Sequence, residues 1–137
     1  MEKTIAPSIF FLIGGGLYCL LEIVWRGQSH WTMFIIGGLC FLILYQINDK
    51  LKNKCPMLLR CLAGATMITI VEFISGCIFN LRLSWNIWDY SDTPFNLLGQ
   101  ICLQYCLLWF LLTLPVILFG DRLMFIIKKF LRRFTIH

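Results

Sequence analysis

IFFLIGGGLYCLLEIVW, residues 9–25, is an apolar run in which Glu22 is the single charged side chain. Runs of this kind are typical of helices that cross a bilayer, whose hydrocarbon core requires roughly 20 apolar residues. Further apolar stretches follow at about residues 32–47, 57–79 and 95–119. The pattern predicts an all-α, polytopic membrane protein with four transmembrane helices in a single membrane domain, residues 1–137.

Composition agrees with this fold class and indicates an orientation. Of the 137 residues 59% are hydrophobic and 14% are charged, which excludes an ordinary soluble domain. The net charge is +5, but most basic residues gather in three places, so we interpret them as a topology signal and expect no nucleic-acid partner. These residues are Lys3; Lys50, Lys52, Lys54 and Arg60; and Arg122, Lys128, Lys129, Arg132 and Arg133. The sequence predicts a multi-pass protein of the cell (inner) membrane with both termini in the cytoplasm.

The last span and the tail are predicted from helix signals. Thr93-Pro94 resembles a cap and first turn, which places the start of the fourth helix at about residue 95. After Gly120, residues 121–135 alternate apolar and basic side chains with helical period. We therefore expect a C-terminal basic amphipathic interfacial helix that binds anionic lipid at the bilayer surface. Docking to a cytoplasmic partner is the alternative.

Ionisable side chains inside the spans are the sharpest functional signals, because a carboxylate in hydrocarbon costs a few kcal/mol unless it is paired or hydrated. Glu22 and Arg26 are four residues apart on one helix, so they can form an ion pair that either secures the helix end or belongs to a site. Glu72 lies deeper, with Asn80 on its face, and its partner must come from another helix or from water.

Asn96, Gln100 and Gln104 recur every four residues and would form one polar stripe on the predicted fourth helix. We expect this stripe to face Glu72, since amides in lipid need hydrogen-bond partners. Packing within the bundle and a substrate or proton pathway both remain open. Trp85, Trp88 and Tyr90, in the loop before the stripe, are interpreted as interface anchors.

Other chemistry has little support. His30 and Asp89 lie in the outer connections and are candidate binding or pathway residues, but no nucleophile with a general base is evident. We expect no catalytic residue, no metal and no cofactor. The seven cysteines lie mostly in apolar helices and predict no disulfide framework. The paired glycines Gly14-Gly15 and Gly37-Gly38 are typical of close packing between helices.

Three stretches resemble a known family: GGLYCLLEIVWRGQSHWTMFIIGGLCF at residues 15–41, VEFISGCIFN at residues 71–80 and WNIWDYSDTPFNLLGQICL at residues 85–103. They are similar to the membrane domain called putative ABC-transporter type IV, or CmpB-like. The resemblance implies a transport-related membrane component and assigns no catalytic role to any residue. The sequence contains no Walker motif, so an ATPase would be a separate polypeptide.

These observations predict a permease-like or accessory component of a transport system that is not an enzyme. Four short spans do not readily enclose a cavity, so transport would require a homo-oligomer or a larger assembly. One alternative is a non-transporting membrane protein that serves interaction or sensing. A less favoured alternative is a small intramembrane enzyme that uses Asp89, His30 and Glu22 on lipid head groups.

Overall fold

A computed structural model describes residues 2–135 of the chain. Within that part, four helices are long and apolar enough to cross a membrane, which confirms the predicted fold class. The helices are α1 (Glu2–Arg26), α2 (Trp31–Leu51), α3 (Met57–Gly76) and α4 (Leu103–Thr135), and a π-helical turn, η1 (Cys77–Arg82), extends α3. The short strands β1 (Asn96–Leu97) and β2 (Ile101–Cys102) pair antiparallel before α4.

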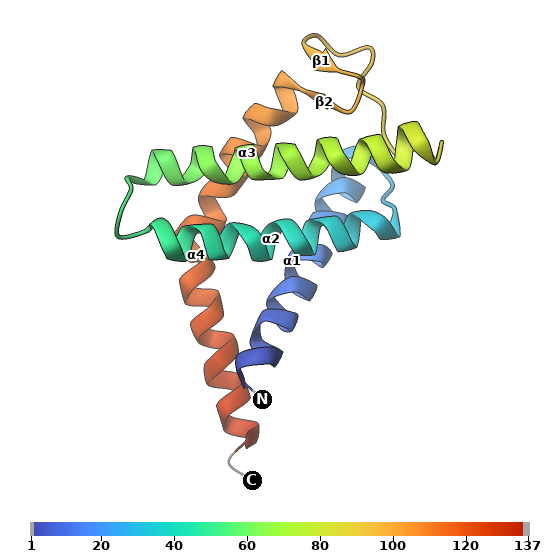
Figure 1. Ribbon diagram of the computed structural model, residues 1–137. Coiled ribbons are helices and arrows are strands. Elements are labelled where there is room, and N and C mark those ends of the chain that lie inside the picture. Colours follow the sequence, from blue (N-terminus) through green and yellow to red (C-terminus); the bar gives the residue numbers. More distant parts are fainter. Residues whose placement is uncertain (1, 136–137) are drawn as a thin grey trace.

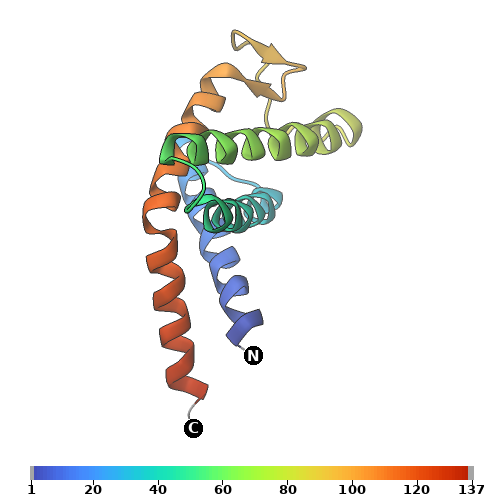
Figure 2. The ribbon, with the colours of Figure 1, turned by 60° about the vertical axis from the view of Figure 1, so that its left-hand side comes forward.

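The helices form two pairs that cross one another. α2 and α3 run antiparallel side by side, and they cross α1 and α4 (Figures 1 and 2). The first turns of α1 and the last turns of α4 lie at the same end of the molecule. The β1–β2 hairpin projects from the opposite end. Residues 83–102, which we call the outer loop, therefore lie at the same end as the α1–α2 connection.

Glycines set the close approach of α1 and α2, as the sequence predicts. A Cβ atom added to Gly37 would overlap Cβ of Tyr18, and one added to Gly14 would overlap the Phe41 side chain. Both helices therefore depend on glycine where they touch, because a side chain at either position would force them apart.

The predicted start of the last helix is wrong. Residues 95–102 form turns and the β1–β2 hairpin, and α4 begins at Leu103. The Asn96 amide donates to the carbonyls of Ser91 and Thr93, and its oxygen accepts from the Gly99 amide. Such bonds between a side chain and nearby backbone compete with helix formation. Gly99 also has a φ of +69°, which ends any helix through this segment.

The separate interfacial helix is not seen either. Residues 121–135 are helical, but they continue α4 through Pro115 and Gly120 without interruption. Met124 and Ile127 are buried against Ala6 and Phe10 of α1, whereas Ile126, Phe130 and Phe134 are exposed. Packing on α1 therefore accounts for only part of the amphipathic pattern.

Candidate functional site

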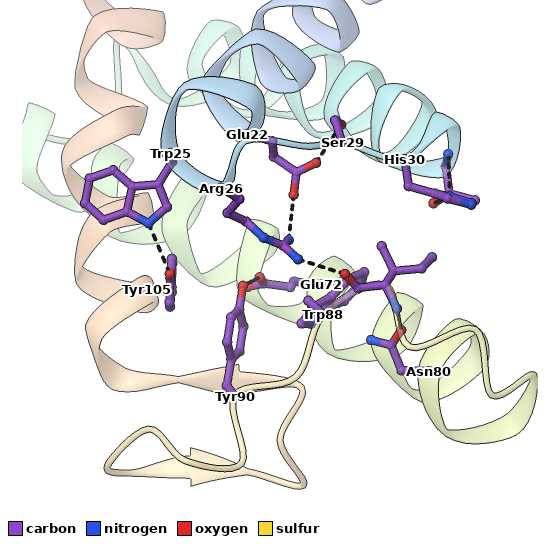
Figure 3. Close-up of polar contacts among 12 residues, drawn as sticks. Glu22, Trp25, Arg26, Ser29, His30, Glu72, Asn80, Trp88, Tyr90 and Tyr105 are labelled. Carbon is purple, nitrogen blue, oxygen red and sulfur yellow. Dashed lines mark hydrogen bonds and ion pairs between the residues drawn. The ribbon is translucent and has the colours of Figure 1, made fainter.

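Glu22 and Arg26 form the predicted ion pair at the end of α1. Arg26 Nη1 lies 3.0 Å from Glu22 Oε1, and the Ser29 hydroxyl donates to Glu22 Oε2 at 2.7 Å (Figure 3). Arg26 Nη2 also donates to the carbonyl of Ile87 at 2.8 Å. The Glu22 side chain is buried. Through Glu22 and the Ile87 carbonyl, the Arg26 guanidinium links the α1–α2 connection to the outer loop.

Glu72 binds two aromatic side chains. The Tyr90 hydroxyl donates to Oε1 at 3.1 Å, and the Trp109 indole N–H donates to Oε2 at 2.8 Å. Burial is the largest cause, and the Glu72 carboxylate the second, of a pKa of Tyr90 that is raised above its ordinary value. The Tyr90 hydroxyl is therefore neutral and acts as a donor. Glu72 on α3 thus holds the outer loop through Tyr90 and α4 through Trp109.

The predicted contact between Glu72 and the amide stripe is wrong, because the stripe does not exist. Asn96 is bonded within the outer loop, as described above. Gln100 lies in the hairpin turn, where its Oε1 accepts from Asn80 Nδ2 at 2.8 Å. Gln104 is exposed on the first turn of α4. The three amides would share one face only if a helix began at residue 95, and α4 begins at Leu103.

Asn80 and Gln100 form the core of a third cluster. The Asn80 oxygen accepts from the Ile87 amide at 2.7 Å, and the Trp88 indole donates to the Gln100 carbonyl at 3.0 Å. Asn80, Trp88 and Gln100 are all buried. Trp88 is therefore a core residue of the outer loop, and interpreting it as an interface anchor was wrong.

His30 and Asp89 have local partners. His30 caps α2, with Nδ1 at 2.8 Å from Thr32 Oγ1 and accepting from the Thr32 amide at 3.4 Å. Asp89 accepts hydrogen bonds from the Ser91 hydroxyl and amide, which lower the pKa of the exposed Asp89 carboxyl. Both contacts stabilise the turns in which these residues lie.

Aromatic contacts join the two carboxylate clusters. Tyr90 stacks on Tyr105 with centroids 4.6 Å apart, and the Trp25 indole donates to the Tyr105 hydroxyl at 3.3 Å. Sequence reasoning missed Tyr105 and Trp109. Their presence inside a predicted span could have identified them, because a buried indole N–H or phenol O–H needs an acceptor.

Two small cavities adjoin these clusters. One, of about 180 Å³, is lined by both Glu22 and His30 together with Ser29 and Trp85. The other, of about 30 Å³, lies among Glu22, Tyr90 and Trp109, and it has room for about one water molecule. Within residues 2–135, no three His, Cys, Asp or Glu side chains gather closely enough to hold a metal ion. The contacts seen among these side chains are hydrogen bonds and the Glu22–Arg26 ion pair.

Comparison with known proteins identifies the family. Residues 10–137 match the family described as putative ABC-transporter type IV. The chain belongs to this family. The match includes all three polar clusters and the outer loop, so the geometry described above lies within the part of the chain that the family shares. No solved structure was found to match the chain.

Proposed function

We propose that the chain is a membrane subunit of an ATP-driven transport system, with ATP hydrolysis supplied by a separate polypeptide and no catalytic activity of its own. Family membership supports a transport-related role. The sequence has no Walker motif, which supports a separate ATPase. The four apolar helices support a multi-pass location in the membrane.

One observation carries the finer part of the proposal: two intramembrane carboxylates on different helices hold the same loop. Glu22 reaches it through Arg26 and the Ile87 carbonyl, and Glu72 reaches it through Tyr90. Because these polar groups bond to one another, the outer loop is held against α1 and α3 in this conformation. We infer that the outer loop is a gate or docking element, and that any substrate path is completed by further copies or other subunits.

The charge pattern supports an orientation for this subunit. We infer that both termini and the connection at residues 52–56 face the cytoplasm, where an ATPase would bind. At that end Lys52 Nζ lies 2.6 Å from Asp49 and 3.3 Å from Asp121, which ties the connection to α4. The basic side chains at the far end of α4 would meet anionic lipid.

Purification in mild detergent tests the ATPase. A tagged chain expressed in its native host is expected to retain vanadate-sensitive ATP hydrolysis, together with a polypeptide that contains a Walker motif. A tagged, unrelated four-span protein of similar size is the control. Absence of nucleotide hydrolysis from the wild-type preparation, after cross-linking in the membrane, would count against a transport ATPase.

Flux measurements test whether Glu72 binds a proton or substrate during transport. The Glu72→Gln variant keeps an oxygen for the Trp109 indole and gains an N–H for the Tyr90 oxygen, but it cannot ionise. If Glu72 binds a proton or substrate, flux through the reconstituted complex falls at least tenfold. Unchanged flux assigns Glu72 to the structure of the gate.

The closed network also favours a second function, a non-transporting interaction or sensor protein. In that case Glu22→Gln and Asn96→Ala lower thermal stability and leave ATP-driven solute uptake unchanged. A parallel loss of uptake in both variants, at a temperature where each is still folded, would exclude this alternative.

A further inference from the structure

Two cavities meet at the Glu22–Arg26 ion pair. Both side chains line a larger cavity of about 180 Å³ and a smaller one of about 30 Å³. The larger cavity also borders three exposed residues at the outer end of the molecule, Gln28, Ser29 and Asn86. Because these residues are exposed, the larger cavity opens to the outer solution. The ion pair is therefore the boundary between that solution and the smaller cavity.

The smaller cavity reaches the two donors that hold Glu72. Its walls include Tyr90 and Trp109, whose O–H and N–H groups donate to the two oxygens of Glu72. Tyr18 of α1 is also in the wall, and its ring stacks on Trp109 with centroids 5.7 Å apart. Within residues 2–135 the Tyr18 hydroxyl has no hydrogen-bond partner, although it is close enough to Glu22 and Glu72 to interact electrostatically with both. The cavity therefore contains a donor without a partner, near two carboxylates.

A water molecule fits this cavity in size and in chemistry. A volume of about 30 Å³ exceeds the roughly 10–15 Å³ that one water molecule requires. A buried water also needs two to four polar partners, and the wall supplies both kinds. The Tyr18 hydroxyl is a donor, and the Glu22 carboxylate and the Tyr90 oxygen are acceptors. A metal cation is disfavoured, because the Arg26 guanidinium lines the same small space and would repel it.

We propose that a water molecule in the smaller cavity completes a proton route from the outer solution to Glu72. Glu22 takes a proton from the larger cavity and gives one to the water. The water gives a proton to the Tyr90 oxygen, and Tyr90 gives its own proton to Glu72 Oε1. One proton has then moved from solution to Glu72, while Glu22, the water and Tyr90 are regenerated. This inference does not depend on the proposed transport function.

Two features make the route one-sided. Arg26 Nη1 lies 3.0 Å from Glu22 Oε1, so a proton on Glu22 leaves the guanidinium without its counter-ion and favours onward transfer. Beyond Glu72, the Trp109 indole donates to Oε2 but has no acceptor atom, so it cannot pass a proton on. Trp109 also lines a groove whose other walls are mostly apolar, and such a surface does not hold water. The route therefore starts at the outer face and ends at Glu72.

Other titratable groups adjoin the route without extending it. Cys40 of α2 lies near Glu72, Tyr105 of α4 stacks on Tyr90, and His30 lines the larger cavity. Unperturbed thiols and phenols are neutral at pH 7, so Cys40 and Tyr105 add no charge there. His30 lies on the outer side of Glu22, and its titration affects the supply of protons and not the end of the route.

Infrared difference spectroscopy of the reconstituted protein follows the Glu72 carboxyl directly. Sealed vesicles hold the protein with its outer end toward the bath, and the carboxylic acid band that Glu72→Gln removes is assigned to Glu72. Acid added to the bath is expected to protonate Glu72. Acidification of the lumen alone, by dilution of ammonium-loaded vesicles, is expected to leave Glu72 ionised. This comparison measures the wild-type protein from its two sides.

Two variants test the steps of the route. Glu22→Gln removes the first proton carrier, and Tyr18→Phe removes a partner of the water but keeps the aromatic ring. Each is expected to slow the protonation of Glu72 after a bath acid jump at least tenfold, and Tyr18→Phe should leave the final protonated fraction unchanged. Tyr45→Phe is the matched control, because Tyr45 is also partly buried against an aromatic ring but lies outside both cavities. Circular dichroism and elution volume check folding, and if one variant fails to fold the other still tests the route.

Four results would overturn the proposal. Absence of a Glu72 acid band at every pH at which the protein is folded would show that Glu72 takes up no proton. Equally fast protonation from the lumen would show that the route is not one-sided. Unchanged rates in the folded variants would show that protons arrive by another path, such as opening of the outer loop. Suppression of protonation by sodium chloride, but not by choline chloride at the same pH, would place a cation in the smaller cavity.

Discussion

Replacing Glu72 by leucine should destabilise the protein, whereas replacing it by glutamine should not. Glutamine can accept from the Trp109 indole through its oxygen and donate to the Tyr90 oxygen through its amide, so both contacts survive. Leucine has similar bulk but leaves both donors without a partner. The two variants therefore separate hydrogen bonding by Glu72 from its ability to carry charge.

The magnitude follows from the two contacts, which are 3.1 and 2.8 Å long. An unpaired buried donor costs about 1–3 kcal/mol, and measured hydrogen bonds between membrane helices average about 0.6 kcal/mol with a maximum near 1.7. Trp109 is buried in the second turn of α4, while Tyr90 is half-buried and can reach water. We expect Glu72→Leu to lower the free energy of unfolding by about 2–3 kcal/mol and Glu72→Gln by less than about 1 kcal/mol.

Titration with a denaturing detergent in mixed micelles, followed by circular dichroism, measures these differences. Thr66→Val is the matched control on α3, because the exposed Thr66 hydroxyl donates only to the Leu62 carbonyl of its own helix. Its effect should stay within about 0.5 kcal/mol. Equal losses for glutamine and leucine would show that charge at Glu72 stabilises the fold. No loss for leucine would show that the two contacts do not hold the outer loop.

Five further substitutions test other features of the fold. Arg26→Gln removes the ion pair and the loop contact, so amide hydrogen exchange in the outer loop should accelerate at least fivefold while exchange in α3 stays unchanged. Asn80→Ala leaves Gln100 Oε1 without its donor and the Ile87 N–H without its acceptor, and should cost about 2–3 kcal/mol in the same micelle titration. Gly37→Ala should cost about 1–3 kcal/mol by separating α1 from α2, whereas Gly16→Ala, which meets no atom within 4 Å, should stabilise by about 0.5–1 kcal/mol. Leu98→Asn should raise the thermal midpoint, since Leu98 has a φ of +52° that costs leucine about 1 kcal/mol; a lower midpoint would mean that its side chain has a partner.

Local patterns in the sequence predict the parts of the fold that depend on local physics. An apolar run of membrane length must become a helix, since every backbone group needs a partner in lipid. The Glu22–Arg26 pair also follows from spacing alone, because residues four apart on a helix are neighbours. Close packing at Gly14 and Gly37 is likewise predicted from a local pattern, the paired glycines.

The errors have a different cause: each depends on a distant partner. An amphipathic segment must cover its apolar face, but the pattern at residues 121–135 does not reveal whether lipid or α1 covers it. Residues 95–102 are apolar except for Asn96 and Gln100 and resemble the start of a span, yet bonds from Asn96 and Asn80 fix a hairpin there. The partners of Glu72 lie 18 and 37 residues away, beyond any local pattern.

The outer loop connects these contacts to a function. Ser84, Asn86, Phe95 and Leu98 have positive φ angles, a conformation that costs about 1–2 kcal/mol for residues other than glycine. Hydrogen bonds that join the loop to Arg26, Glu72 and Asn80 offset this strain, and each contributes a free energy of similar size. Release of one contact therefore shifts the balance between the held loop and other conformations. A ligand or partner subunit that binds the released loop more tightly than the held one would need only a few kcal/mol of differential affinity to move it. If the outer loop is the gate proposed above, the role of the intramembrane polar residues requires neither a pore nor a catalytic centre: they set the free energy at which the outer loop opens.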